Sequence, residues 1–431
     1  MILAVNTSSN AMNHIAAGLA RAGLLSKYVR PYANMDRVWE RRVSQLPVLG
    51  RTYKRTVGRR TMPEPLTLVN IRESGRIPDF LMAAHQRFPA RLGAHKSIRQ
   101  SLMHARTASV AHAAVKAFTG ERAVVSSWGT AEPVFRLAQA RGALCVLSYP
   151  LAHHRFTRRV LAEESELHPE LADTLTGHDR PPWLQERFDA EIDMADYILV
   201  GSTFVQESFI SEGIPSEKLV VIPYGADTGL FSPAEPSTRK TSDFRLLFVG
   251  QIGQRKGISY LFEAVDKIAG PGISLTLVGE IQGDGTAFEP YRHLFRHVRQ
   301  LPRPELRVIY QQSDVFVFPT IVEGMPLVVL EAMASGLPVV TTPNGPGDIV
   351  RDGIDGFLVP PRDADAIATR VNWLRQDTEM RYEMGRNARN RAQSFTWNSY
   401  GQRVVAHLKT WLRDLEQEDC NSAGTSRGHA S

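Results

Sequence analysis

Two carboxylates, Glu323 and Glu331, lie in one apolar, glycine-bearing stretch of the chain with seven residues between them. An ionised carboxylate can accept paired hydrogen bonds from vicinal hydroxyls, such as those of a sugar or a ribose. The loop of residues 324–326 adds backbone donors, and Gly324 lets a ligand approach the backbone closely. Either glutamate alone is compatible with a helix cap or a solvated surface residue. Together with the surrounding glycine and proline positions, the pair favours a sugar-nucleotide site.

The elements that must position these carboxylates form a predicted strand, loop, helix and strand. The apolar run 315–318 predicts a buried parallel strand, and a helix is predicted from Pro326 to about Ser335. Gly336 suits a left-handed C-cap, and Pro338 prevents the helix from continuing. Ligands of open α/β sheets bind at the carboxyl ends of the strands, and the N-terminus of a helix there attracts a diphosphate.

This stretch also resembles a known family in its residue order. FPTIVEGMPLVVLEAMASGLPVV, which begins at Phe318, and the later DGIDGFLVPP resemble the donor-site signature of the retaining GT-B glycosyltransferases of family 4, the glycosyltransferase group 1. The resemblance implies an α/β fold of the GT-B type, with two Rossmann-like domains facing each other across a cleft. It implies that Glu323 and the amides of residues 324–326 engage the donor sugar, and that Glu331 binds the ribose hydroxyls. It covers nearly the whole chain from Asp196 onward and is architectural before that residue.

Length, composition and charge bound the class of protein. A chain of 431 residues with 43% hydrophobic and 22% charged residues is long enough for two domains with separate cores. Only two cysteines are present, so we expect no disulfide framework and a cytoplasmic location. No signal peptide and no membrane-spanning segment are expected, so any membrane contact is predicted to be peripheral. The net charge of +6 suggests an anionic partner, such as a polyphosphate donor or an acidic lipid surface.

The order of predicted elements divides the chain into domains and connecting segments. A strand over 2–5 and a helix over 13–22 open the first Rossmann-like domain, and a proline- and serine-rich stretch marks a linker. The predicted organisation is an acceptor-side domain over 1–222, a linker over 223–242, a nucleotide-sugar-binding domain over 243–395, a helix returning to the N-terminal domain over 396–415, and a disordered tail over 416–431.

Two loops are candidates for binding phosphate. After the strand that ends at Gly250, the loop QIGQRKG carries Arg255 and Lys256 before a predicted helix, a sensible diphosphate site. The family usually has an arginine where Gln251 stands, so Arg255 is the candidate to supply that charge. The loop TSSNAMN at residues 7–13 lacks the family's glycine pair, and its serines and asparagine would act as side-chain donors instead.

The resemblance implies further site residues. Family members often place a histidine near the donor sugar in the loop after the strand 144–147, and of two adjacent histidines we favour His153. The segment 298–301 resembles the place where backbone groups read the base, so the side chains leave uridine, guanosine and adenosine open. The predicted catalytic residues are Glu323, Lys256, Arg255 and His153. The predicted donor-binding residues are Gly250, Gln251, Gly324, Met325, Pro326, Leu327, Glu331, Arg299 and Leu301.

Residues 27–60 are strongly basic, with apolar residues interleaved. One interpretation is an interfacial segment whose cations contact an anionic membrane. The other is a solvated insertion packed on the N-terminal domain, which Pro47 and Gly50 favour because they interrupt a helical pattern. Nucleic-acid binding is not expected, because no recognition motif accompanies the charge.

No metal site and no cofactor are expected besides the nucleotide diphosphate sugar as substrate. The sequence Asp363-Ala364-Asp365 imitates a metal-binding D-x-D motif, but it precedes an amphipathic helix and is interpreted as its cap. The predicted function is retaining transfer of a hexose-type sugar to a glycan, glycolipid or small-molecule acceptor. A sugar-nucleotide epimerase or hydrolase, or a catalytically silent binding protein, are the alternatives.

Overall fold

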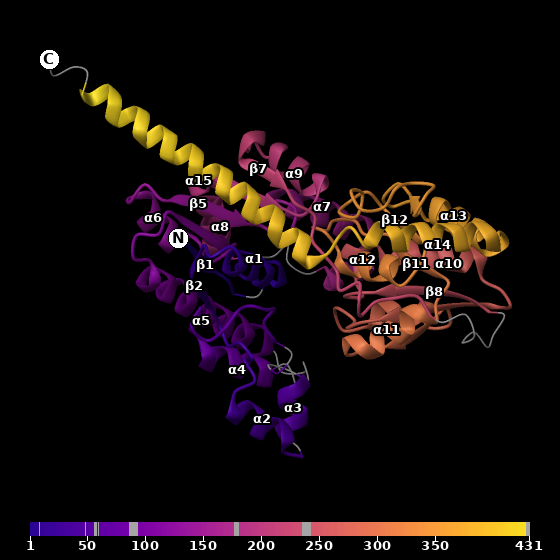
Figure 1. Ribbon diagram of the computed structural model, residues 1–431. Helices are drawn as coiled ribbons and strands as arrows, with labels where there is room; N and C mark the ends of the chain where they lie inside the picture. The colour runs from indigo at the N-terminus through magenta and orange to yellow at the C-terminus, as the bar shows by residue number, and fades with distance from the viewer. Residues whose placement is uncertain are drawn as a thin grey trace. The chain divides into compact units, whose positions relative to one another are not determined.

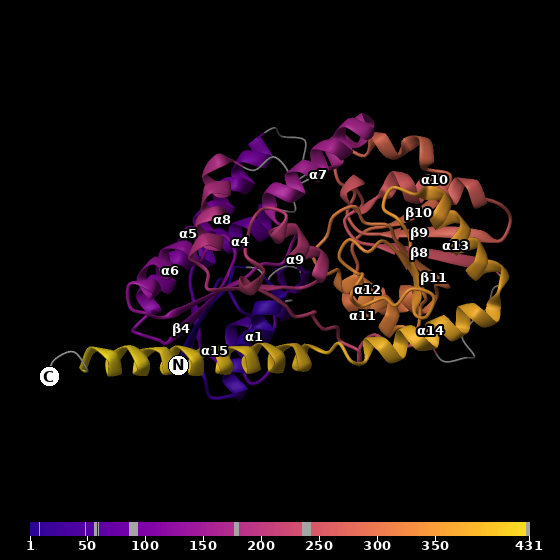
Figure 2. The same cartoon turned by 90° about the horizontal axis from the view of Figure 1, so that it is seen from above.

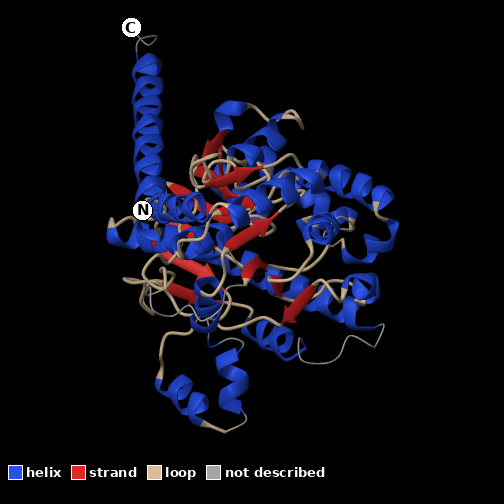
Figure 3. Ribbon diagram, turned by 90° about the vertical axis from the view of Figure 1, so that its right-hand side faces the viewer, coloured by secondary structure: helices blue, strands red, loops and turns tan. Residues whose placement is uncertain are grey.

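The computed structural model describes residues 1–7, 9–47, 49–55, 58, 60–85, 94–175, 181–234 and 243–427. They form two parallel β-sheets with helices packed against them, which confirms the predicted α/β class; helices are blue and strands red in Figure 3. Seven strands make the first sheet, in the order β3-β2-β1-β4-β5-β6-β7, and six make the second, in the order β10-β9-β8-β11-β12-β13. Most strands are followed by a helix, as parallel pairing requires of its crossover connections, whereas a loop alone joins β12 to β13.

The element bounds follow the labels of Figure 1. The first sheet contains β1 (Ile2–Val5), β2 (Leu25–Arg30), β3 (Ile71–Glu73), β4 (Ala123–Ser127), β5 (Leu144–Ser148), β6 (Tyr197–Val200) and β7 (Leu219–Val221). The second contains β8 (Phe244–Val249), β9 (Ile273–Val278), β10 (Phe295–Val298), β11 (Val315–Phe318), β12 (Val339–Thr341) and β13 (Gly356–Leu358). The helices before β8 are α1 (Asn10–Arg21), α2 (Val38–Gln45), α3 (Leu49–Arg55), α4 (Arg76–His85), α5 (Ala94–Ala117), α6 (Glu132–Gln139), α7 (His154–Leu167), α8 (Pro182–Met194) and α9 (Thr203–Ile210). Those after it are α10 (Ile258–Ile268), α11 (Arg303–Gln311), α12 (Leu327–Ala334), α13 (Ala364–Gln376), α14 (Thr378–Ala392) and α15 (Trp397–Arg427), and the short 3₁₀ segments include η2 (Pro169–Thr174) and η5 (Gln254–Lys256).

The second sheet has the strand order of a dinucleotide-binding fold. Its first strand, β8, neighbours both β9 and β11, so the order reverses between β8 and β11. Helices α10, α11, α12 and α13 surround this sheet in the views of Figures 1 and 2. In open α/β sheets a ligand crevice opens beyond the carboxyl ends of the two strands at such a reversal. A ligand-binding site is therefore expected at the loops after β8 and β11.

The apolar runs from which the sequence analysis predicted strands form the core of this sheet. All four side chains of β11 are buried, and the Phe248 ring of β8 stacks on Phe318 with ring centroids 5.6 Å apart. Phe318 also stacks on Phe316 at 5.9 Å. Burial of such a continuous apolar run holds the carboxyl ends of β8 and β11 in register.

By contacts between residues the chain divides into two compact units. The first unit comprises Met1–Tyr149, Pro182–Leu199 and the chain from Tyr400 onward, and the second comprises Pro150–Pro181 and Val200–Ser399. Helices α7 and α9 therefore group with the second sheet. The predicted domain boundaries divide the chain by sequence and stay a prediction, and residues 235–242 of the predicted linker lie outside the described residues.

The last helix, α15, is longer than the sequence analysis expected. It runs from Trp397 to Arg427, so the prediction of a disordered tail is corrected over 416–427. The strong helix formers Glu416, Gln417 and Glu418 continue the helix because no proline interrupts them. Within the first unit, Trp411 of α15 stacks on Tyr197 with ring centroids 3.9 Å apart.

The basic segment 27–60 is partly folded into the first unit. Tyr32 and Tyr53 are buried in one apolar cluster, against which Val43 and Phe80 pack. Arg37 pairs with Glu40 at 2.8 Å and with Glu73 at 3.0 Å. These ion pairs and this burial agree with the interpretation of the segment as an insertion packed on the N-terminal domain. The exposed residues of α2 are compatible with the other interpretation, contact with a membrane. No helix among the described residues has the length and apolar character that a membrane span requires.

The acidic pair at the start of α13 has the predicted capping role. The Asp363 carboxylate accepts a hydrogen bond from the Ala366 backbone N–H at 2.8 Å, which makes Asp363 the N-cap of the helix. Asp365 is exposed and pairs with Lys267 at 2.7 Å. The capping prediction is confirmed.

Candidate functional site

The loops that follow β8 and β11 are pressed against each other. Gly257 has φ +71°, and a Cβ there would lie 2.0 Å from the Pro319 carbonyl oxygen. The Ile321 N–H donates to the Arg255 carbonyl oxygen at 3.1 Å. Only glycine tolerates both the left-handed backbone and this close approach. The two loops therefore form one rigid surface at the strand-order reversal.

Three charged side chains meet on this surface, and we call them the ionic cluster: Arg255, Lys256 and Glu323. The Lys256 ammonium contacts the Glu323 carboxylate, and Arg255 Nη1 lies 3.1 Å from the same carboxylate oxygen. The side chains of Lys256 and Glu323 are 9% and 10% exposed, so these charges are largely removed from water. The structure thus brings together three of the four predicted catalytic residues.

Burial alters the protonation of both cations. It lowers the pKa of Lys256 well below its usual range, and the neighbouring Arg255 guanidinium lowers it further. Burial also lowers the pKa of Arg255, to about 10. The contact with the Glu323 carboxylate favours the charged form of both. An anion that joined the cluster would do the same, so the site is built to accept further negative charge.

The loop that carries Glu323 is held from several sides. Its own carboxylate accepts a hydrogen bond from the Gly324 N–H at 3.1 Å, and Ser202 Oγ donates to the Gly324 carbonyl oxygen at 3.0 Å. A Cβ on Gly324 would lie 1.8 Å from the Pro150 carbonyl oxygen, so only glycine fits there. Met325 is buried, and its sulfur accepts a hydrogen bond from the Tyr224 N–H at 2.8 Å.

Glu331 lies on α12, which starts at Leu327 directly after Pro326. It is 9% exposed, and it lies 3.3 Å from Arg303 Nη2 and accepts from the Tyr310 hydroxyl at 3.4 Å. Burial raises the pKa of Glu331 to about 7, and the neighbouring Arg303 guanidinium counteracts part of this rise. Glu331 is therefore a buried, partly satisfied acceptor, the kind of group that a ligand hydroxyl completes.

A small pocket opens beside the ionic cluster. Its lining residues are Thr174, Gln251, Gly253, Arg255, Lys256 and Gln282. Gln251 Oε1 lies 3.4 Å from Arg255 Nη2, so the glutamine in the family's arginine position contacts the arginine predicted to supply that charge. Gly250, where the loop after β8 begins, has φ +153°, a backbone conformation that favours glycine.

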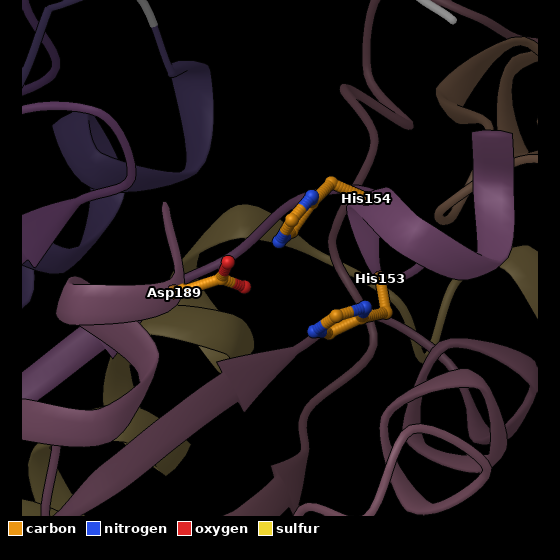
Figure 4. A group of neighbouring side chains, drawn as sticks. All are labelled: His153, His154 and Asp189. Atoms are coloured by element: carbon orange, nitrogen blue, oxygen red, sulfur yellow. The ribbon is translucent and has the colours of Figure 1, made fainter. Parts of the chain in front are cut away.

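His153 has a structural position that the sequence did not indicate. It is the N-cap of α7, where Nδ1 accepts from the Arg155 N–H at 3.3 Å, and it is 2% exposed. Figure 4 shows its ring beside that of His154, with centroids 4.7 Å apart. Its loop adjoins the Glu323 loop, because Ala152 and Val322 belong to one apolar cluster. The predicted catalytic role of His153 stays a prediction.

The other predicted site residues lie at the edge of the second sheet or outside it. Arg299 is 80% exposed and pairs with Glu280 at 3.3 Å, and Leu301 follows it two residues on, half-buried. They come after β10, which β9 separates from β8. In the loop after β1, Ser9 is the N-cap of α1 without a side-chain capping bond, and Ser8 lies outside the described residues.

Sequence reasoning missed the buried residues that support the ionic cluster. Gln254 is fully buried and donates to Glu164 of α7 at 2.8 Å, and Arg362 donates to the other oxygen of Glu164 at 2.8 Å. No local pattern marks Glu164, because its partners are 90 and 198 residues away.

Comparison with known proteins gives consistent results. The model of the family described as glycosyl transferases group 1 matches residues 234–391. D-inositol 3-phosphate glycosyltransferase of Corynebacterium aurimucosum is 30% identical over 297 residues, 63% of this chain and 69% of that protein. Sucrose-phosphate synthase from Thermosynechococcus elongatus superposes with a TM-score of 0.64 at 18% identity, covering 96% of this chain and all of the other. HepE of Anabaena in complex with UDP has a TM-score of 0.59 at 16% identity, covering 95% of this chain and 99% of the other. The fold is of the GT-B type.

We predict that Glu331 makes stability pH-dependent. Its folded-state pKa of about 7 lies above the ordinary 4.5, so the stability it contributes when protonated is present below about pH 4.5 and is lost as pH rises through about 7. At about 1.4 kcal/mol per pH unit, Glu331→Gln should become more stable relative to the wild type by about 2 to 3 kcal/mol between pH 5 and pH 8.

Denaturant unfolding at both pH values measures this difference, with Glu305→Gln, an exposed carboxylate on α11, as the control. A difference between Glu331→Gln and the wild type that stays the same at pH 5 and pH 8 would contradict the prediction.

Proposed function

The chain belongs to the group 1 glycosyltransferases, and on that premise we propose that it is a retaining family 4 enzyme that transfers a hexose-type sugar from a nucleoside diphosphate sugar to an acceptor. The observation that carries the proposal is the ionic cluster at the carboxyl ends of β8 and β11: a buried lysine and a buried carboxylate, with a partly buried arginine on the same carboxylate oxygen. A diphosphate is the ligand whose charge and size suit adjacent Lys and Arg side chains at such a strand-order reversal.

In this proposal Lys256 and Arg255 bind the diphosphate and stabilise the negative charge that develops as it leaves the sugar. Both are held in place before the reaction, in surroundings poor in water, where a charge contact is worth more than in bulk solvent. Glu323 holds the two cations in position and presents its remaining lone pairs to hydroxyls of the donor sugar.

Glu331 and the pocket beside the cluster would hold the nucleoside. The buried Glu331 carboxylate would accept hydrogen bonds from the ribose hydroxyls, and its ionised form accepts them better than the protonated form. The complex of the structural relative HepE contains UDP, which supports a nucleotide donor for this chain and makes UDP-sugars the first donors to examine.

Retention follows from front-face transfer, in which the acceptor hydroxyl attacks from the side of the leaving diphosphate. The acceptor's proton passes to the leaving diphosphate oxygen, so the reaction needs no protein nucleophile. The ionic cluster supplies the positive charge, so we propose that no metal ion is required. The proposed acceptor is a glycan, a lipid-linked sugar or a small molecule; the relative named for D-inositol 3-phosphate makes a phosphorylated polyol one candidate.

Two alternatives use the same site. An epimerase or hydrolase would consume donor without any acceptor, which product analysis by NMR detects. A catalytically silent binding protein would bind the nucleotide without turnover. The departures Gln251 and TSSNAMN from the family pattern are the features that keep this second alternative open.

We further propose peripheral contact with an anionic membrane through α2. On this helix Val38 is 59% exposed and Trp39 43% exposed, next to the exposed cations Arg41 and Arg42. Apolar and aromatic groups beside cations suit the headgroup region of an acidic bilayer.

We predict that Lys256→Ala slows turnover by about 10²- to 10³-fold while the fold is kept, because it removes a preorganised charge from the leaving group. Initial rates with UDP-, GDP- and ADP-hexoses, together with circular dichroism, measure both effects. Lys267→Ala, which removes a half-exposed lysine of α10, is the matched control. Turnover that is the same in Lys256→Ala and the wild type would remove Lys256 from the mechanism.

For the membrane contact, we predict that Arg41→Glu combined with Arg42→Glu abolishes flotation with vesicles containing anionic lipid, at about 1 kcal/mol per lost cation plus repulsion. Vesicles of neutral lipid should bind neither protein. The control is Arg386→Glu, an exposed cation of α14. If the variant that combines Arg41→Glu with Arg42→Glu floats as well as the wild type does, α2 does not contact the membrane.

A further inference from the structure

Glu164 of α7 is a fully buried carboxylate at the centre of a hydrogen-bond network in the second unit. It has no exposed surface, and its two oxygens accept from three side chains on three separate segments. Oε1 accepts from Gln254 Nε2 at 2.8 Å and from the Tyr260 hydroxyl at 2.8 Å, while Oε2 accepts from Arg362 Nε at 2.8 Å. A buried carboxylate is tolerated only when it is satisfied in this way, so these four residues depend on one another.

The network fixes Gln254 at both its backbone and its side chain. The Gln254 N–H donates to Thr174 Oγ1 of η2 at 2.9 Å, and its Oε1 accepts from the Ser259 N–H at 3.2 Å. Its Nε2 also donates to Ser259 Oγ at 2.7 Å. Gln254 is thus locked between α7, η2 and the start of α10, and the next two residues of the chain are Arg255 and Lys256.

Arg362 has an unfavourable backbone conformation, and its contacts in the same hydrogen-bond network explain why an arginine is found there. Its φ of +66° is in the left-handed region, where a side chain with a Cβ is strained and glycine is the usual residue. An arginine there gains two carboxylate partners, Glu164 at 2.8 Å and Glu163 at 3.3 Å. The charge contact offsets the strain, and it supplies the cation that the buried Glu164 requires.

We propose that Glu164 is a positioning residue for the proposed transfer reaction. It acts through Gln254 to hold the η5 turn, and so places Arg255 and Lys256 against Glu323. It touches neither donor nor acceptor. The inference rests on the proposed function for its kinetic consequence, whereas its structural consequence, an ordered η5 turn, is independent of any activity.

The test is Glu164→Gln, which keeps the size of the side chain and removes its charge. The new amide group would face Gln254 Nε2, Tyr260 or Arg362, all of which donate, so at least one bond of the network is lost. Glu191→Gln is the matched control. Glu191 is also fully buried and accepts from backbone N–H groups of Gly129 and Ala131, but it belongs to the first unit, whereas η5 belongs to the second.

Hydrogen–deuterium exchange of the segment 250–258 gives the first readout. It should rise in Glu164→Gln and not in Glu191→Gln, even if both variants lose similar stability. In kinetics we expect kcat to fall by about 10- to 100-fold in Glu164→Gln, since small displacements of charged groups cost this much, with an unchanged KM for the acceptor. The double variant that swaps the two side chains, Glu164→Gln with Gln254→Glu, restores a carboxylate–amide pair. It should recover part of the lost hydrogen–deuterium exchange protection and part of the lost kcat.

Exchange of 250–258 that is the same in Glu164→Gln and in the wild type would overturn the inference, whether or not the protein turns over a sugar nucleotide. So would faster exchange with an unchanged kcat, because Glu164 would then stabilise the turn without positioning the cations. A wild type that binds and turns over no sugar nucleotide would instead refute the proposed function, and the exchange result would still decide whether Glu164 orders η5.

Discussion

The contact between Lys256 and Glu323 is the constraint on which the rest of the second unit depends. Two cations and a carboxylate are removed from water at the end of a sheet, and each would cost several kcal/mol if it were left there alone. Each is therefore tolerable only while the others are in place. This requirement ties the loop after β8 to the loop after β11, and Gly257 is the residue that lets these loops approach closely enough.

The same constraint accounts for the chemistry that we propose. Charges fixed by the fold do not have to reorganise when a leaving group becomes negative, which is the condition for effective electrostatic catalysis. Glu323 orders the cations in the absence of ligand, and a bound diphosphate would take over part of that role. Burial disfavours the charged forms of Lys256 and Arg255, so an anionic ligand gains affinity by relieving that cost.

How much the sequence predicted depended on whether the signal was local. The strand Val315–Phe318, the helix that follows Pro326 and the cap Asp363 were predicted from neighbouring residues, because apolar periodicity, proline and capping chemistry act within a few positions. Lys256 and Glu323 were predicted as site residues from their residue types and loop context, and a family resemblance supplied their roles. Their direct contact was not, since it joins residues 67 positions apart.

The residues that sequence reasoning missed make contacts at long range. Glu164 has no motif, and only the fold brings Gln254 and Arg362 to it. Arg303 and Tyr310, which share Glu331, come from a helix on the other side of β11 in the sequence. The helical end of α15 was missed for a different reason: polar, small residues predict a tail by composition, although the helix formers at 416–418 extend the helix.

The most direct test of the central claim compares a nucleoside diphosphate with its monophosphate. Calorimetric titration of the wild type and of Lys256→Gln with UDP and UMP isolates what the second phosphate contributes to affinity. If the ionic cluster binds the diphosphate, UDP binds the wild type about tenfold or more tightly than UMP, and Lys256→Gln loses most of that advantage, since a charge-assisted contact is worth roughly 1.5 to 3 kcal/mol. An advantage of UDP over UMP that is equally large in both proteins would contradict the account, because the second phosphate would then bind somewhere other than Lys256.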